Sequence, residues 1–388
     1  MKTIVSWIDK IHWWLVKSIL KIPQYFFLRR LSAVPKRIIV LRNCFFGDFV
    51  VAIPALRALR NAFPQAHIVL LTASSFSTRW RNHPIDNAMF DIDPGLINEV
   101  IRYDADNLLN FKAILALRDR LSTKENSACL VLCYSGQSLL SRIKRILLCI
   151  LLGIPFPFGL TSSRVLPFQR LLNRWRVDRL DIKHQYTAAL DSTNELLVKY
   201  NLFKYQETTY YQFNRSTQKK CSLIGIAPFS KQPVKQWPLQ RFAELMVLLE
   251  KHTGAHFEVY GASEEIEMAQ QLEKFLNKRV YATFLCGALT PFQLRQRLEA
   301  VDLLICLDSG PMHLASLVGT PLVAIFSQIT LHQLWRPWGP RGLMVSKEVD
   351  CAVCNTHTGK CPRGTRTCID GISLDSVLEQ ARLLLRSC

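Results

Sequence analysis

One stretch of the chain, residues 302–326, combines a polar turn with the start of a helix. Its two short apolar runs, Leu303–Leu307 and Leu322–Phe326, are typical of buried parallel strands. A helix that begins at Pro311 is expected between them, because the first helical position does not need the N–H that proline lacks. The unpaired N–H groups and the positive dipole end of such a helix attract anions, and a diphosphate would fit there.

The side chains of this turn could add specific contacts. A serine hydroxyl can donate a hydrogen bond to a phosphate oxygen, and a histidine lies within the first helical turn. An ordinary strand–helix turn with a capping aspartate is the alternative. The candidate residues are Asp308, Ser309, Gly310, Pro311, Met312 and His313.

A second polar loop precedes the helix expected at Leu239–Lys251. Ser230, Lys231 and Lys235 place hydroxyl and ammonium donors on this loop. Such donors near the start of a helix make a reasonable phosphate cradle. A solvated basic loop is the alternative.

Three carboxylates also stand where strands end. Glu264 and Glu265 follow the strand expected at His256–Tyr260, where a carboxylate could accept hydrogen bonds from ribose hydroxyls or cap the next helix. Asp48 follows the strand expected at Arg37–Leu41. It is either a helix N-cap or a carboxylate held over the strand ends, where α/β proteins place their ligands.

Strands that alternate with helices over short connections predict doubly wound parallel sheets. No G-x-G-x-x-G sequence occurs, which weighs against a nicotinamide or flavin enzyme. Besides the strands already named, strands are expected at His67–Thr72, Asn98–Tyr103, Ala128–Tyr134, Cys221–Ala227 and Tyr281–Leu285. Helices are expected from Asp48 to about Ala62 and at Leu109–Leu121, Ser138–Leu152, Lys183–Tyr200 and Pro291–Glu299.

The length of 388 residues suggests two domains. The polar residues 206–220 are interpreted as a linker between an N-terminal domain, 36–205, and a C-terminal domain, 221–388. Residues 1–35 form a separate extension, in which Trp and Ile recur at helical spacing with Lys between them. This pattern predicts an amphipathic helix at a membrane interface, although a helix docked on the protein's own core is the alternative.

A formal net charge of +19 predicts an anionic partner. The basic regions, residues 1–42 and 139–180, also carry bulky apolar side chains, which suits a membrane surface better than a nucleic-acid groove. No zinc-finger, RNA-binding or basic-zipper pattern is present. No cleavable signal peptide is evident, and cysteines scattered through apolar strands are typical of a reduced cytosolic protein.

The C-terminal region contains four closely spaced cysteines. Their number is compatible with a tetrahedral zinc site, but the spacing is not the paired C-x2-C form. Reduced thiols packed under a loop are the alternative. These residues are Cys351, Cys354, Cys361 and Cys368.

Several of these segments, in this order, resemble glycosyltransferase family 9, the ADP-heptose:lipopolysaccharide heptosyltransferases. The resemblance covers roughly residues 36–380. The matching segments are Arg37–Phe63, Ser138–Gly159, Ile224–Glu250 with Lys235-Gln-Trp-Pro238, Tyr260–Glu265, Asp308–Ala315 with Gly319-Thr-Pro321, and the cysteine tail that ends Cys361-Pro-Arg-Gly364.

The resemblance implies a GT-B fold: two Rossmann-like domains that face each other across a cleft, with the nucleotide sugar on the C-terminal domain and the acceptor on the N-terminal one. It implies inversion at the sugar carbon without a metal or other cofactor. Carried over by position, Asp48 would be the general base. Lys235 and Ser230 would contact the diphosphate, and Glu264 or Glu265 would contact the ribose. Asp308 would repel a phosphate, so it is expected to bind sugar hydroxyls or to orient the backbone.

This chain departs from the family pattern around the expected cleft, which bears on the sugar and the acceptor more than on the fold. Phe229 stands where a glycine is usual, and Cys133 stands where an aspartate is usual. Cys44, Phe45 and Phe46 replace small residues, and Ser327-Gln328 replaces Gly-Pro.

The sequence therefore predicts a cytoplasmic glycosyltransferase, peripheral on the inner membrane. It would move a sugar, most simply heptose from ADP-heptose, to a lipopolysaccharide core or a related anionic glycolipid. A catalytically silent, membrane-associated module that binds nucleotide sugars or lipids is the alternative.

Overall fold

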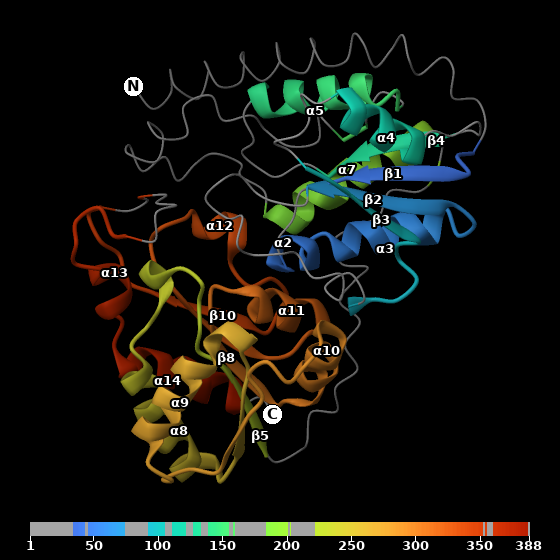
Figure 1. Cartoon of the computed structure of the whole chain (residues 1–388). Coiled ribbons are helices and arrows are strands. Elements are labelled where there is room, and N and C mark those ends of the chain that lie inside the picture. Colours follow the sequence, from blue (N-terminus) through green and yellow to red (C-terminus); the bar gives the residue numbers. More distant parts are fainter. Residues whose placement is uncertain are drawn as a thin grey trace. The chain divides into compact units, whose positions relative to one another are not determined.

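The computed structural model describes residues 34–42, 46–73, 92–104, 111–121, 127–132, 139–154, 158–159, 184–200, 202, 222–351, 354 and 360–386. The chain forms two compact units that divide between Tyr210 and Tyr211. In Figure 1 the first unit runs from blue to light green, and the second from yellow to red. The expected N-terminal helix and the expected linker lie outside the described residues, so both stay predictions.

The first unit contains a parallel sheet in the order β3-β2-β1-β4. In chain order, β2 and β3 are added on one side of β1, and β4 is added on its other side. The pair β1 and β4 therefore flanks the point at which the connecting segments change from one face of the sheet to the other. The strands are β1 (Arg37–Leu41), β2 (His67–Ala73), β3 (Glu99–Tyr103) and β4 (Ser127–Val131). The helices are α2 (Phe46–Val50), α3 (Ile53–Ala62), α4 (Phe111–Leu121), α5 (Leu139–Leu151) and α7 (Gln185–Lys199).

The second unit contains a six-stranded parallel sheet in the order β10-β9-β8-β5-β6-β7. Its strands are β5 (Leu223–Ala227), β6 (His256–Val259), β7 (Ala282–Phe284), β8 (Leu303–Leu307), β9 (Leu322–Phe326) and β10 (Gly342–Ser346). Its helices are α8 (Leu239–Thr253), α9 (Ile266–Leu276), α10 (Pro291–Ala300), α11 (Gly310–Val318), α12 (His332–Trp335), α13 (Thr367–Asp370) and α14 (Leu374–Leu385), with short 3-10 turns η3 (Pro233–Lys235) and η4 (Ser263–Glu265).

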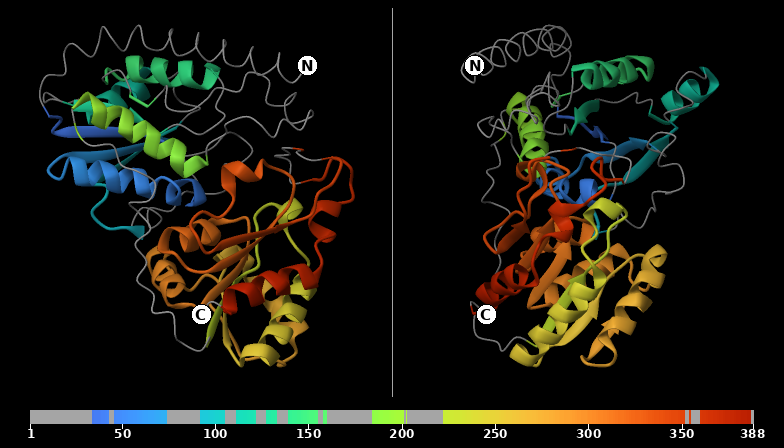
Figure 2. Two further views of the ribbon diagram at one scale, coloured as in Figure 1. Left: turned by 180° about the vertical axis from the view of Figure 1, so that it is seen from behind. Right: turned by 90° about the vertical axis from the view of Figure 1, so that its left-hand side faces the viewer.

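Helices pack on both faces of each sheet, as Figure 2 shows from two further directions. In the second unit, α8, α9 and α14 share a buried apolar cluster with the alternate residues of the strands. In the first unit, α4 and α5 pack against the residues of the sheet that include Ile39 and Leu41. Helices α3 and α7 pack against each other. None of the described helices has the length and hydrophobicity that a membrane crossing requires.

The expected strands are all present, with ends shifted by at most a few residues. The helix expected from Asp48 to Ala62 is wrong in one respect, because it is two helices, α2 and α3. Pro54 occupies the second position of α3 and lacks the N–H that would continue the hydrogen-bonding of α2. Strand β10 and helix α14 were not expected from the sequence.

Candidate active site

The second unit places its two polar loops at one point of the sheet. β5 and β8 are adjacent, and the strand order reverses between them. Connections that leave neighbouring strands toward opposite faces open a crevice at the carboxyl ends, which is where open α/β sheets bind ligands. The loop after β5 carries Ser230, Lys231 and Lys235, and the loop after β8 carries Asp308 and Ser309. The fold therefore brings together segments that are about 80 residues apart in sequence, as the pairing of Ile224 with Leu303 shows.

The two loops meet in a buried ion pair. Lys235 Nζ lies 2.6 Å from Asp308 Oδ2, and the two side chains are 15% and 7% exposed. Burial of both charges removes most of their hydration, so each depends on the other. Asp308 therefore holds the ammonium group of Lys235 above the strand ends. Its expected contact with sugar hydroxyls stays a prediction.

Helix α11 begins beside this pair. Ser309 is its N-cap and Gly310 its first residue, so Pro311 takes the second position instead of the expected first one. The Ser309 hydroxyl donates to the carbonyl of Leu307 over 3.3 Å. Gly319 ends the helix with φ of 72°, in the left-handed region that glycine adopts without strain. The first N–H groups of a nine-residue helix thus open toward the crevice.

His313 lies one turn inside α11 and is buried between aromatic rings. Its ring centroid lies 5.5 Å from that of Trp338, nearly parallel to it, and 5.8 Å from that of Trp335. Burial lowers the pKa of His313 to about 4, Asp308 opposes this shift, and Lys235 adds to it. The imidazole is therefore neutral at neutral pH. Its Nδ1 is buried and has no hydrogen-bond partner in the structure.

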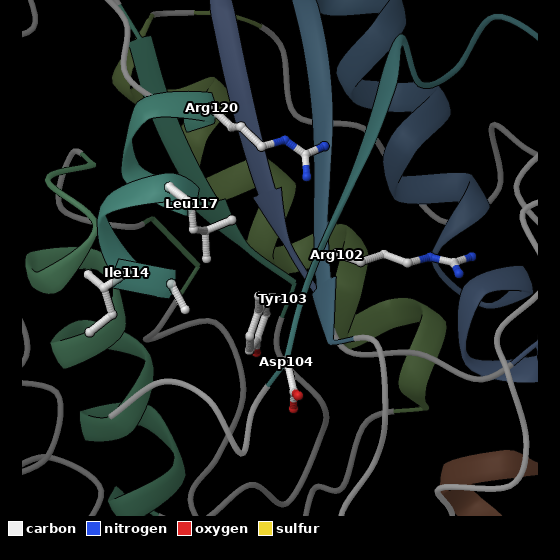
Figure 3. Close-up of a pocket in the computed structure, with 8 residues that line it drawn as sticks. Arg102, Tyr103, Asp104, Ile114, Leu117 and Arg120 are labelled. Atoms are coloured by element: carbon white, nitrogen blue, oxygen red, sulfur yellow. The ribbon is translucent and has the colours of Figure 1, made fainter. Parts of the chain in front are cut away.

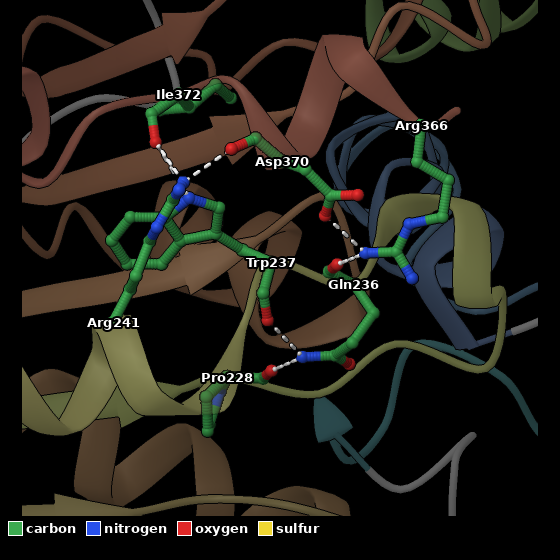
Figure 4. A network of polar contacts seen from close by, with 7 residues as sticks. All are labelled: Pro228, Gln236, Trp237, Arg241, Arg366, Asp370 and Ile372. Atoms are coloured by element: carbon green, nitrogen blue, oxygen red, sulfur yellow. Dashed lines mark hydrogen bonds and ion pairs between the residues drawn. The ribbon is translucent and has the colours of Figure 1, made fainter.

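The loop after β5 is held rigid from inside by Gln236. Its Nε2 donates to the carbonyls of Pro228 over 2.6 Å and Trp237 over 2.9 Å, as Figure 4 shows. Its Oε1 accepts from the N–H of Ser230 over 3.1 Å. Since Gln236 follows Lys235 directly, this side chain fixes both ends of the loop that carries the lysine.

The same loop is tied to the C-terminal segment. The fully buried indole of Trp237 donates to the carbonyl of Ile372 over 3.1 Å. Arg366 donates to the carbonyl of Gln236 and pairs with Asp370 over 2.7 Å, as Figure 4 shows. Neither Gln236 nor Arg366 was expected from the sequence. The bond from Arg366 to the carbonyl of Gln236 joins residues 130 positions apart, which no local pattern announces.

The two glutamates after β6 differ in environment. Glu265 Oε2 accepts from the N–H of Ala262 over 2.8 Å, and burial raises the pKa of Glu265. It thus caps the start of its own helical turn. Glu264 is exposed and lies 3.7 Å from Lys231, a separation at which a solvated pair stabilises little. A Cβ at Gly261 would approach Phe229, Cys286 and Glu265, so the backbone here is closely surrounded.

In the first unit, Asp48 lies in α2, directly after the strand β1. It is the third residue of the helix, inside the first turn, where the helix dipole favours a carboxylate. Its side chain is half-buried, at the carboxyl edge of the sheet beside the change of direction between β1 and β4. The preceding departures from the family pattern, Cys44 and Phe45, lie outside the described residues.

Polar side chains that the sequence analysis missed line the same edge. Thr72 and Arg102 are register partners on β2 and β3, so their side chains share one face of the sheet. Thr72 is fully buried, and its Oγ1 has no hydrogen-bond partner in the structure. The same holds for Nε and Nη2 of Arg102. A polar ligand at this edge would satisfy these groups.

A cavity of about 260 Å³ lies on the opposite face of the same sheet, between β3 and α4. Figure 3 shows Tyr103 directed toward Ile114 and Leu117 of α4, whereas Arg102 points away from them. Strand β2 separates β3 from β1, so this cavity is distinct from the position of Asp48.

The four tail cysteines line one cavity of about 120 Å³, together with Val234 and Arg366. Cys351, Cys361 and Cys368 are free thiols. Backbone hydrogen bonds from residues 363–366 lower the pKa of Cys361, whereas burial raises that of Cys368. Within the described ranges, no three His, Cys, Asp or Glu side chains gather closely enough to hold a metal ion. The four cysteines thus lie at one cavity, as the zinc hypothesis requires. In the described part of the chain, however, they are not close enough together to bind one metal ion.

Comparisons with known proteins agree on one family. The sequence pattern of glycosyltransferase family 9 (heptosyltransferase) matches residues 145–362. The lipooligosaccharide heptosyltransferase 2 of Campylobacter jejuni is 23% identical over 345 residues, which cover 88% of this chain and 96% of that protein.

Solved structures agree on the fold. The ADP-heptose lipopolysaccharide heptosyltransferase II of E. coli is 19% identical, with a TM-score of 0.57 over 90% of this chain and 98% of that one. The iron-containing dodecameric glycosyltransferase TibC of enterotoxigenic E. coli is 12% identical, with a TM-score of 0.50 over 91% of this chain and 77% of that one.

Proposed function

Because the chain belongs to glycosyltransferase family 9 (heptosyltransferase) and is a glycosyltransferase, we propose that it transfers heptose from ADP-heptose to a lipopolysaccharide core. Relatives named for heptose transfer to lipopolysaccharide or lipooligosaccharide support this substrate pair. The comparisons do not favour a catalytically silent module.

The second unit would bind the donor. The observation that carries this assignment is the ion pair between Lys235 and Asp308 at the β5–β8 switch point, beside the start of α11. A diphosphate needs cations and N–H donors, and this position offers an ammonium group together with the free N–H groups of a helix. His313 Nδ1 could accept or donate one hydrogen bond to the donor, since the imidazole is neutral.

The first unit would bind the acceptor, with Asp48 as general base. Asp48 would take the proton of an acceptor hydroxyl while that oxygen attacks the anomeric carbon of the sugar. The bond from this carbon to the diphosphate oxygen breaks, and ADP leaves with the electron pair. Lys235 and the N–H groups of α11 would stabilise the charge that grows on the diphosphate. Attack opposite the leaving group inverts the configuration.

The remaining assignments are proposals of the same kind. Ser230 and Lys231 would contact the donor beside Lys235, and Glu264 or Glu265 the ribose. Met312 is fully buried, so it would support the start of α11 from the core instead of touching the donor. Transfer would need no metal, since the ammonium group and helix N–H groups supply the positive charge that a metal would otherwise supply. A cytoplasmic location, peripheral on a membrane, would bring the enzyme to a lipid-linked acceptor.

The test is a transfer assay with ADP-heptose and a heptose-deficient lipopolysaccharide acceptor, in the presence and absence of a chelator. We expect ADP release that depends on the acceptor, and a product whose anomeric configuration is opposite to that of the donor. Asp48→Asn should lower kcat by at least about a hundredfold, as expected for the loss of a general base. Near-normal turnover of this variant would refute the assignment of the base.

A further inference from the structure

The helix α5 of the first unit is apolar on two opposite sides. Leu148 and Cys149 face the unit's core, where they are almost completely buried against the sheet. A helix that is apolar all round normally buries its whole circumference. The second side of α5 is therefore the feature that needs an explanation.

That second side is exposed. Ile143, Leu147, Ile150 and Leu151 are 40%, 52%, 63% and 51% exposed. Their spacing of i, i+4, i+7 and i+8 places them along one stripe of a helix. We call these four residues the α5 stripe. They are four of twelve large apolar side chains that stand exposed in the described part of the chain, and no other described helix carries more than two of them.

The charged residues of α5 itself have one sign. The helix sequence, LLSRIKRILLCIL, contains three basic residues and no acidic one. Lys144 is exposed, and Arg145 is half-buried. An apolar stripe on a helix whose only charged residues are cationic is typical of a helix that lies in the interface of an anionic bilayer. The stripe contains no aromatic or Met side chain, the apolar types that are enriched at protein–protein interfaces.

We infer that the α5 stripe is a membrane-docking surface that takes an anionic phospholipid bilayer. The apolar side chains enter the region between headgroups and acyl chains, and Lys144 meets the lipid phosphates. This inference rests on the proposed function in one respect, because a lipid-linked acceptor gives the enzyme a reason to lie on the bilayer. It would place the first unit, which carries Asp48, beside the acceptor.

The test is sedimentation of the full-length protein with vesicles. Vesicles of phosphatidylglycerol and phosphatidylcholine are compared with vesicles of phosphatidylcholine alone. Leu147→Glu/Ile150→Glu should lower the partition coefficient on the anionic vesicles at least about tenfold, because each carboxylate must leave water. Val198→Glu/Leu383→Glu is the matched control, since these residues are 47% and 53% exposed on other helices. It should stay within about twofold of the wild type.

Lys144→Glu should weaken binding to anionic vesicles and leave binding to neutral ones unchanged. Hydrogen exchange of the wild-type protein should slow in residues 139–151 when anionic vesicles are added. Unchanged partition of the double variant would overturn the inference, as would an equal loss in the control. A change of oligomeric state in the double variant, with vesicle binding intact, would overturn it in favour of contact between two copies.

A water-soluble acceptor oligosaccharide separates this inference from the proposed function. The double variant should transfer sugar to the soluble acceptor at the wild-type rate and to vesicle-embedded acceptor more slowly. If the wild-type protein binds anionic vesicles through α5 but transfers no heptose, the proposed function fails and the docking surface stands.

Discussion

The ion pair between Lys235 and Asp308 allows stability and catalysis to be separated in one set of variants. Lys235→Met keeps the length of the side chain and removes its charge, which leaves Asp308 buried and unpaired. Loss of one partner from a buried pair costs about 3–5 kcal/mol. Since Lys235 is 15% exposed, we expect a cost near the lower limit, about 3 kcal/mol of unfolding free energy. Asp308→Asn should cost a similar amount.

The double variant Lys235→Met/Asp308→Asn removes both charges. It should recover most of the lost stability, because no buried charge is left without a partner. It should not recover activity. If the ammonium group stabilises the leaving diphosphate, its loss lowers kcat/KM about 10²–10³-fold in the single and the double variant alike. Urea unfolding followed by circular dichroism gives the stabilities, and ADP release gives kcat/KM.

Arg295→Met is the control for removal of an ion pair as such. The pair of Arg295 with Glu299 on α10 is partly solvated, with side chains 22% and 44% exposed, so this variant should lose no more than about 1 kcal/mol and no activity. Recovery of kcat/KM together with stability in the Lys235/Asp308 double variant would refute our reasoning. It would mean that the pair only supports the fold and that Lys235 does not meet the donor.

Three further perturbations test other parts of the site. The pKa of His313 is about 4 in the folded protein, below its ordinary 6.5, so between these values only the unfolded chain binds a proton at this residue. The free energy of unfolding should therefore decrease by about 3 kcal/mol from pH 6.5 to pH 4. His313→Gln should flatten this dependence, as measured by urea unfolding at each pH. An equally steep dependence in the variant would contradict that assignment. Gly261→Ala places a Cβ about 2.9 Å from Phe229 and Cys286, so it should cost about 1–3 kcal/mol of unfolding free energy and weaken ADP binding measured by calorimetry. Wild-type stability and affinity in this variant would show that the loop can move to accommodate the methyl group. Iodoacetamide should label Cys361 before the buried Cys129 and Cys306, because backbone N–H groups lower the pKa of Cys361 whereas burial raises that of the other two. Mass spectrometry gives the order of labelling, and earlier labelling of Cys129 or Cys306 would contradict this prediction.

Local sequence signals predicted the elements that position the proposed donor site. The apolar runs at 303–307 and 322–326, with Pro311 and Gly319 between them, specify β8, α11 and β9 through strand burial, a proline at a helix start and a left-handed helix end. These signals act within a few residues. They can therefore be recognised in the sequence without knowledge of the rest of the fold.

Contacts between distant segments could not be predicted in the same way. The bond between Lys235 and Asp308 joins residues 73 positions apart and depends on β5 lying next to β8. The stacking of His313 on Trp338 depends on how the chain returns after β9. The edge strand β10 is mostly half-buried and lacks a clear alternation. In contrast, α14 carries a usable signal, an N-cap at Ser373 before an amphipathic run, which the sequence analysis overlooked.

The division of labour between the two units is the central claim, and the affinity for ADP tests it most directly. Isothermal titration of ADP should give the wild-type Kd for Asp48→Asn, since that residue is assigned to the acceptor. The same titration should give a Kd at least about tenfold higher for Lys235→Met, which would lose the proposed charge-assisted contact with the diphosphate. Weaker ADP binding in Asp48→Asn, with an unchanged Kd in Lys235→Met, would contradict the claim.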